Sequence, residues 1–264
     1  MAFEIERRFG SLTYARGLKT IGITAHSSEG GALCFLTACH AGAEQLGTHM
    51  HPDIVLSAVP MGLSMPAWEA DDHEAVAQHL IRGVQIVADA GADFYVCPDN
   101  TAHIVLEKVA GRMPIPGLHI GHVVCREIER NGWTRVGLLG TKWTMTGPVY
   151  ERALAAHSME RLVPDKSMRL KLNAAIFDKL CQGRFTDATT KLFQHAIDGL
   201  IDQGAECVIL GCTEIPLIIN DENSALPVLD STRLLARHAV AEALDDHGIA
   251  SEAGWISAQG RYSS

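Results

Sequence analysis

GADFYVCPDNT (Gly91–Thr101) and GAECVILGCTE (Gly204–Glu214) align without a gap when Gly91 is placed on Gly204. Each segment begins with glycine and alanine, continues as a short apolar run and ends in polar residues. Apolar runs bounded in this way are typical of buried strands. The alignment places Asp99 on Cys212, so we predict two equivalent strands, one ending near a carboxylate and the other near a thiol.

Two further pairs of segments support an internal duplication. TIGITAHS (20–27) resembles RVGLLGTK (135–142), and IPGLH (115–119) resembles LPVLD (226–230). Matches that recur in the same order indicate two related halves. Ligands of open α/β sheets collect outside the carboxyl ends of the strands. We therefore expect Asp99 and Cys212 on opposite sides of one crevice.

The short strand-like runs alternate with longer amphipathic stretches. Residues 74–91 and 190–205 place apolar side chains three and four positions apart and end at or near glycine, which is typical of helices. This alternation predicts an α/β fold with mainly parallel sheets. The fold class is thus two pseudo-symmetric α/β domains with the site between them.

The composition of the chain argues against some classes of protein. The chain has 264 residues, a formal net charge of −9 and 47% hydrophobic residues. An acidic balance argues against general nucleic-acid binding, and no run of about 18 apolar residues predicts a membrane span. Seven cysteines, an odd number without a compact spacing, favour reduced thiols. We expect a soluble, cytoplasmic protein.

Three motifs resemble the aspartate/glutamate racemase superfamily: DNTAH (99–103), VGLLGTKWTM (136–145) and LGCTEIPLI (210–218). The resemblance covers about residues 19–230. It implies catalysis without a cofactor, a homodimer, and two cysteines that remove and return the proton on the α carbon of a small carboxylate or amino acid. Cys212 matches the second of these cysteines, whereas Asp99 stands at the position of the first.

We predict the domains from the same resemblance and the repeat. Residues 17–116 form the first domain, to which residues 226–264 return, and residues 117–225 form the second. Aspartate- or glutamate-like compounds are the first candidate substrates.

Inversion of a carbon centre needs an acid and a base on opposite faces, which Asp99 and Cys212 could supply. Their ordinary pKa values differ by about 4.6 units. Apolar burial is expected to raise the pKa of Asp99, whereas the thiolate of Cys212 would be favoured by a helix beginning at CTEIP (212–216).

Other roles for these residues stay open. Cys212 could act alone, as in a maleate isomerase-like or arylmalonate decarboxylase-like enzyme. Asp99 could cap the helix predicted to follow it, and the loss of one thiol could leave a carboxylate-binding protein without catalysis. Cys97 is a backup nucleophile, because strand alternation would place it on the same face as Asp99.

Polar residues after the strand ends are candidates for holding the substrate. Asn100, Thr101 and Thr213 follow the two matched strands, where N–H groups and hydroxyls can face a carboxylate. The resemblance adds Thr141, Lys142 and Thr144 as a carboxylate-holding turn, Glu214 as an orienting group, and Ser28 in the corresponding turn of the first half. No spacing of histidine, cysteine and acid predicts a metal site, and no motif predicts a nucleotide or pyridoxal phosphate.

Overall fold

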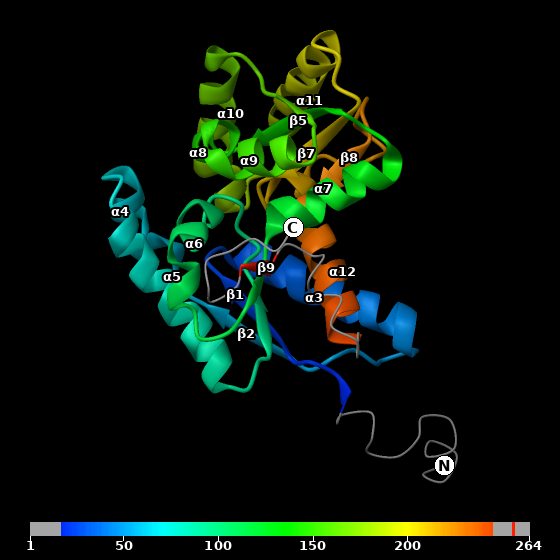
Figure 1. Ribbon diagram of the computed structural model, residues 1–264. Helices are drawn as coiled ribbons and strands as arrows, with labels where there is room; N and C mark the ends of the chain where they lie inside the picture. Colours follow the sequence, from blue (N-terminus) through cyan, green and yellow to red (C-terminus); the bar gives the residue numbers. More distant parts are fainter. Residues whose placement is uncertain (1–16, 245–254, 257–264) are drawn as a thin grey trace.

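Two separate sheets flanked by helices make up the computed structural model, which describes residues 17–244 and 255–256 (Figure 1). The first sheet has the strand order β2-β1-β3-β4-β9 and the second has the order β6-β5-β7-β8. The strands are β1 (Ile21–Ala25), β2 (Ile54–Ala58), β3 (Phe94–Val96), β4 (Gly117–Leu118), β5 (Arg135–Gly140), β6 (Glu160–Leu162), β7 (Cys207–Gly211), β8 (Val228–Asp230) and β9 (Trp255–Ile256). Every pairing is parallel except that of β4 with β9. The predicted α/β class with mainly parallel sheets is confirmed.

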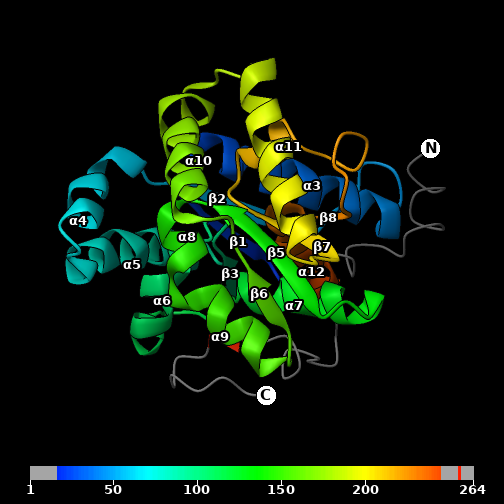
Figure 2. The same cartoon turned by 90° about the horizontal axis from the view of Figure 1, so that it is seen from above.

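Helices connect and cover the strands. The α-helices are α3 (Ser28–Leu46), α4 (Met65–Glu69), α5 (His73–Asp89), α6 (His103–Val109), α7 (Ile120–Asn131), α8 (Lys142–Thr146), α9 (Pro148–Ala156), α10 (Lys166–Asp178), α11 (Asp187–Asp202) and α12 (Ser231–Leu244). Short 3-10 turns are η1 (Met61–Leu63), η2 (Ala110–Arg112), η3 (Leu180–Gln182) and η4 (Ile215–Leu217). In two views at right angles α4 lies at the edge of the molecule (Figures 1 and 2). No helix of the described ranges is long and apolar enough to cross a membrane.

The strand register confirms the duplication. Gly22 pairs with Tyr95 in the first sheet, and in the second sheet Gly137 pairs with Val208. These are the residues that the sequence repeat matches, and β4 and β8 continue the same correspondence. Each half thus repeats one topology, so β3 and β7 are structural equivalents.

Burial on both faces explains the continuous apolar strands. Phe94 and Val96 belong to a core cluster with residues of α3 and α12, whereas Tyr95 between them packs with residues of α5 such as Val84. Because helices cover each face of the sheet, every position of β3 is apolar.

The glycine that opens each matched segment has a backbone reason. Gly91 and Gly204 have φ of 95° and 88°, in the region that L side chains rarely adopt. Each follows a helix and turns the chain into its strand, which explains why the repeat is anchored on glycine.

Strand pairing assigns two segments differently from the predicted boundaries at 116/117 and 225/226. β4 pairs with β3 in the first sheet, and β8 pairs with β7 in the second. Both strands therefore belong to the half that precedes the predicted boundary, because each half completes its parallel sheet before the chain crosses over. Helix α12, which follows β8, packs on α3. Residues 245–254 and 257–264 of the predicted first domain lie outside the described residues.

Candidate active site

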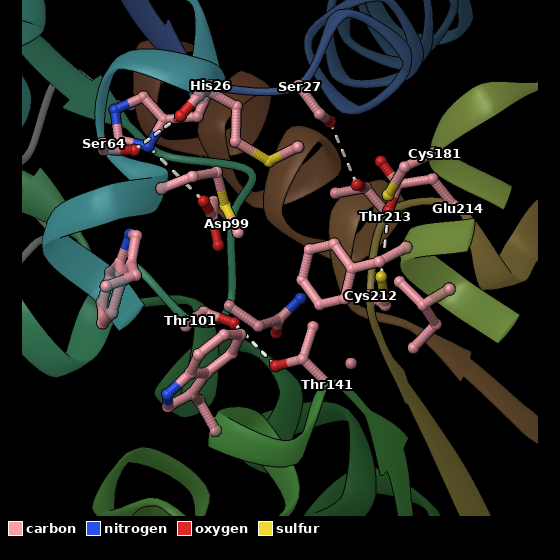
Figure 3. A pocket seen from close by; sticks show the side chains of 18 residues that line it. His26, Ser27, Ser64, Asp99, Thr101, Thr141, Cys181, Cys212, Thr213 and Glu214 are labelled. Carbon is pink, nitrogen blue, oxygen red and sulfur yellow. Dashed lines mark hydrogen bonds and ion pairs between the residues drawn. The ribbon is translucent and has the colours of Figure 1, made fainter. Parts of the chain in front are cut away.

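A pocket lies at the carboxyl ends of strands from both sheets (Figure 3). The residues that line it are His26, Ser27, Met61, Ser64, Met65, Trp68, Asp99, Asn100, Thr101, Thr141, Trp143, Ile176, Phe177, Cys181, Gly211, Cys212, Thr213 and Glu214. Asp99 and Cys212 enter this single pocket from the equivalent strands β3 and β7 and from opposite sides.

Asp99 is held by contacts at both carboxylate oxygens. Its Oδ1 accepts a hydrogen bond of 3.1 Å from the N–H of Ala102, at the start of α6, and its Oδ2 lies 3.5 Å from Nδ1 of His26. Burial raises the pKa of Asp99, but the hydrogen bond to His26, the His26 charge and the Ala102 N–H outweigh it, so the net pKa is lowered. The predicted upward shift is wrong, because sequence reasoning did not include these partners. The carboxylate is ionised at neutral pH.

The surroundings of Cys212 shift its pKa in the opposite direction to that of Asp99. Its Sγ donates a hydrogen bond of 2.9 Å to Oε2 of Glu214, and the residue is 8% exposed. Burial and then the neighbouring Glu214 carboxylate raise the pKa of this thiol well above its usual range. The expected helix at CTEIP is only the 3-10 turn η4, which is too short to stabilise a thiolate. Cys212 is therefore a protonated thiol that can donate its proton.

Three threonine hydroxyls join the two halves beside these groups. Thr101 Oγ1 lies 3.0 Å from the hydroxyls of Thr141 and Thr144, which lie 3.2 Å from each other. Thr101 and Thr141 line the pocket, whereas Thr144 contacts them without lining it. Each hydroxyl can both donate and accept, so the cluster can turn a donor toward a bound carboxylate.

The amino end of α3 closes a second junction between the halves. Ser27 caps this helix by accepting a hydrogen bond from the N–H of Gly30, and its Oγ lies 3.3 Å from Oγ1 of Thr213. A Cβ on Gly30 would lie 2.7 Å from both Ser27 Oγ and Thr213 Cγ2. Glycine is therefore needed for the helix to approach Thr213, and its N-terminus adds positive potential to the pocket.

The sequence that builds this pocket matches a known family over most of its length. A family model described as Asp/Glu/Hydantoin racemase matches residues 29–239.

This chain belongs to the Asp/Glu/hydantoin racemase family.

A curated relative and solved structures are similar to this chain in sequence and fold. A broad-specificity amino-acid racemase, RacX of Bacillus subtilis (strain 168), is 29% identical over 171 residues, which are 64% of this chain and 73% of RacX. A crystal structure of a candidate Asp/Glu racemase from Yersinia pestis has 29% identity and a TM-score of 0.78, covering 86% of this chain and 100% of the other. An aspartate racemase homologue from Pyrococcus horikoshii OT3 has 27% identity and a TM-score of 0.74, with the same coverage. The chain is thus similar to racemases in sequence and in fold.

Most of the predicted site residues of this racemase-family chain line the pocket. Thr144, Lys142, Ser28 and Cys97 do not. Lys142 places Nζ 4.4 Å from the ring centroid of Trp143 and does not line the pocket. The exposed Ser28 hydroxyl donates to Glu29 and lines an adjoining hollow. Cys97 is fully buried among apolar side chains, because β3 ends at Val96 and strand alternation does not continue past it.

Asn100 lines the pocket with most of its amide already used. Its Oδ1 accepts a hydrogen bond of 2.6 Å from the hydroxyl of Tyr150, and its Nδ2 donates to Oγ of Ser231 at 3.0 Å. Only one amide N–H remains for a ligand. Asn100 therefore holds the two halves together, and its capacity for substrate is small.

Sequence reasoning missed several lining residues. The repeat could have indicated His26, because the match of residues 20–27 with 135–142 pairs His26 with Thr141. Cys181 in η3 also lines the pocket, where burial and the nearby Glu214 charge raise its pKa to about 12. Met61 and Trp68 had no such signal, because their segment after β2 has no counterpart in the repeat.

Proposed function

We propose that this protein is an amino-acid racemase that moves a proton at the α carbon of a small amino acid, without a cofactor, through Asp99 and Cys212. The single observation that supports this is their shared pocket: two proton-transfer groups at equivalent strand ends line one cavity from opposite sides. A substrate held between them presents one face of its α carbon to each.

The protonation states give the groups different first roles. The Asp99 carboxylate accepts the α proton, and the electron pair of the broken C–H bond remains on the carbon. The Cys212 thiol then donates its proton to the opposite face, which forms the new C–H bond and leaves a thiolate. Asp99 ends protonated, and solvent restores both groups.

The remaining polar groups suit the substrate carboxylate. Hydroxyls of Thr101 and Thr141, with Ser27 and Thr213 across the pocket, are positioned as donors. Hydrogen bonds that strengthen as charge spreads from the α carbon onto the carboxylate lower the barrier to proton removal.

Glu214 acts on Cys212 at two stages of this mechanism. In the resting protein it accepts from the Cys212 thiol. Once that proton has been transferred, Glu214 and the new thiolate repel each other, which drives the return of a proton to sulfur. This role deepens the orienting function that the family resemblance implies.

Label exchange tests the proposal. Single enantiomers are incubated in deuterated water, and the enantiomers are separated and analysed by mass spectrometry. Because the Cys212 proton exchanges with solvent, the first product molecules should carry deuterium while the recovered substrate does not. Cys212→Ser should reduce this exchange by about 10²- to 10⁴-fold, whereas Cys39→Ser on α3 serves as the matched thiol control. Absence of label across a broad amino-acid panel would refute the racemase.

One observation favours a second candidate, in which Cys212 acts alone. Asp99 already bonds to the Ala102 N–H and faces His26, and its lowered pKa makes it a weak base. A single-thiol decarboxylase needs only the Cys212 proton, which takes the place of the departing carboxylate on carbon, whereas a cis/trans isomerase needs the Cys212 thiolate to add to the double bond and to leave again after rotation. Carbon dioxide release from an arylmalonate, or conversion of maleate to fumarate, would support this candidate over the racemase.

A further inference from the structure

The pocket has two chemically distinct parts. The polar part surrounds Asp99 and Cys212 and contains the hydroxyl groups described above. The rest of the lining is mainly apolar and aromatic, with Cys181 and with Ser64, whose hydroxyl donates to the Met61 carbonyl oxygen. Its apolar and aromatic members are Met61, Met65, Trp68, Trp143, Ile176 and Phe177. Among the described residues that line the pocket there is no lysine or arginine.

The aromatic residues form one continuous wall that crosses between the halves. The rings of Trp68 and Trp143 lie 6.2 Å apart at 48°, and those of Trp143 and Phe177 lie 6.0 Å apart in an edge-to-face arrangement. Trp68 comes from α4 in the first half, whereas the other two come from α8 and α10 in the second. Both halves must be in place for this wall to exist.

The charges in the pocket are unfavourable for a substrate with a second carboxylate. Asp99 and Glu214 are acidic, and His26, the one histidine among the described lining residues, already faces Asp99, so repulsion between like charges opposes a further anion there. Lys142, which precedes Trp143 in the chain, places its ammonium over the Trp143 ring and does not line the pocket. A charged side chain placed against the apolar wall would lose its hydration without gaining an ionic partner.

We propose that the substrate of this site is an α-amino acid with an uncharged apolar side chain, and that the wall of Trp68, Trp143 and Phe177 selects it. This inference rests on the proposed racemase function and narrows its substrate class. It replaces the aspartate- or glutamate-like substrate that the sequence suggests. Aromatic and branched aliphatic side chains bury their surface favourably against such a wall.

Met61 and Met65 allow the pocket to accept apolar side chains of different shape. Both are partly exposed and stand on the segment between β2 and α5, next to Trp68. Unbranched thioether side chains adjust to different shapes. The site should therefore accept phenylalanine, leucine and methionine, which differ in shape but share an apolar surface.

A substrate panel tests the inference directly. The deuterium exchange assay is run with phenylalanine, leucine and methionine against aspartate, glutamate and lysine. We expect kcat/KM for the apolar set to exceed that for the charged set by about tenfold or more. Faster exchange of aspartate, glutamate or lysine would overturn the inference while leaving the racemase intact. No exchange of any member would overturn the proposed function instead.

A binding measurement keeps the two questions separate. The α-methyl amino acids have no α proton, so they bind without reacting. Fluorescence of the pocket tryptophans reports the dissociation constants of α-methylphenylalanine and α-methylaspartate. Tighter binding of α-methylphenylalanine by about tenfold or more supports the inference even if no turnover occurs, and equal or reversed affinities contradict it.

A matched pair of variants tests the wall itself. Phe177→Arg places a cation in the pocket and should move the preference toward aspartate and glutamate by about tenfold. Phe185→Arg makes the same change at an exposed phenylalanine outside the pocket and should leave the preference as it was. Thermal denaturation verifies that both variants fold. An unchanged preference in a folded Phe177→Arg protein would overturn the role of the wall.

Discussion

The ends of β3 and β7 are equivalent in topology and register, yet the group that follows each has a different charge state. Asp99 after β3 faces His26 and an N–H donor, and its pKa is lowered. Cys212 after β7 faces Glu214, and its pKa is raised. The contrast lies in these neighbours and in the backbone that follows each strand, which is the helix α6 after Asp99 and only the 3-10 turn η4 after Cys212.

This difference teaches how a duplicated fold becomes an unequal catalytic pair. A carboxylate and a thiol in identical surroundings would differ by about 4.6 pKa units. The neighbours widen that difference instead of reducing it. The protein therefore rests in one protonation state, with a charged base at the first strand end and a protonated acid at the second.

The largest effect is expected from removing the charge at the first strand end. Asp99→Asn keeps an oxygen that can accept from the Ala102 N–H, so the turn before α6 is preserved. It removes the base and should lower the exchange rate by about 10²- to 10⁴-fold. Exchange kinetics with a purified, folded variant measure the loss.

A cap outside the pocket gives the control for this variant. Asp72 caps α5 by accepting from the N–H of Ala75 at 3.0 Å. Asp72→Asn should leave the exchange rate within about twofold, since surface substitutions of this kind have small effects. Full activity of Asp99→Asn would show that Asp99 only caps its helix.

The next effect concerns the free energy of unfolding, which depends on pH through three buried histidines near the end of β3. The Nδ1 of His103 lies 2.9 Å from the carbonyl oxygen of Asp99, and its ring contacts that of His119 edge to face. His119 contacts His122 in the same way. Burial lowers the pKa of each of these three histidines to about 3. Their unfolded pKa is about 6.5. The unfolded chain thus binds more protons between about pH 6.5 and 3, and stability must fall as the pH falls through this window.

Urea denaturation at a series of pH values measures this loss. Each histidine contributes a slope of about 1.4 kcal/mol per pH unit below about pH 6.5. His122→Gln should reduce the slope by about that amount, and His40→Gln, at an exposed position of α3, should not change it. A wild-type stability that stays constant from about pH 7 to 4 would contradict the buried neutral state.

A smaller effect is expected at the second strand end. Glu214→Gln removes the charge next to Cys212 and should lower the pKa of the thiol, since burial then acts without the carboxylate. The pH dependence of Cys212 alkylation by iodoacetamide, followed by peptide mass spectrometry, should shift to lower pH. Alkylation of Cys39 provides an internal control. A shift to higher pH would exclude Glu214 as the cause of the raised pKa.

The smallest effect is expected at the junction of the two halves. Thr101→Val removes one hydroxyl of the threonine cluster and should raise KM by about tenfold, the loss of one hydrogen bond to a charged group. Thr190→Val on α11 is the matched control. Steady-state kinetics separate KM from kcat, and an unchanged KM would exclude Thr101 from substrate binding.

The sequence by itself determined the architecture and the two strand ends. Gly91 and Gly204 mark a repeat whose strand register the structure reproduces, because apolar periodicity and left-handed turns are local properties of the chain. The same repeat predicted that Asp99 and Cys212 share one site, and the motifs around them indicated the family. Thr101 followed from its position after a matched strand, whereas Thr141 came from the family motif.

Tertiary structure decided what those strand ends carry. The direction of each pKa shift, the burial of Cys97 and the aromatic wall depend on contacts between residues far apart in the chain, such as His26 with Asp99 or Trp68 with Trp143. Charge interactions and desolvation act through space and have no sequence period. The sequence pattern therefore determines that Asp99 and Cys212 lie at equivalent strand ends. Only the residues packed around them in the folded protein determine their charge and the shape of the pocket.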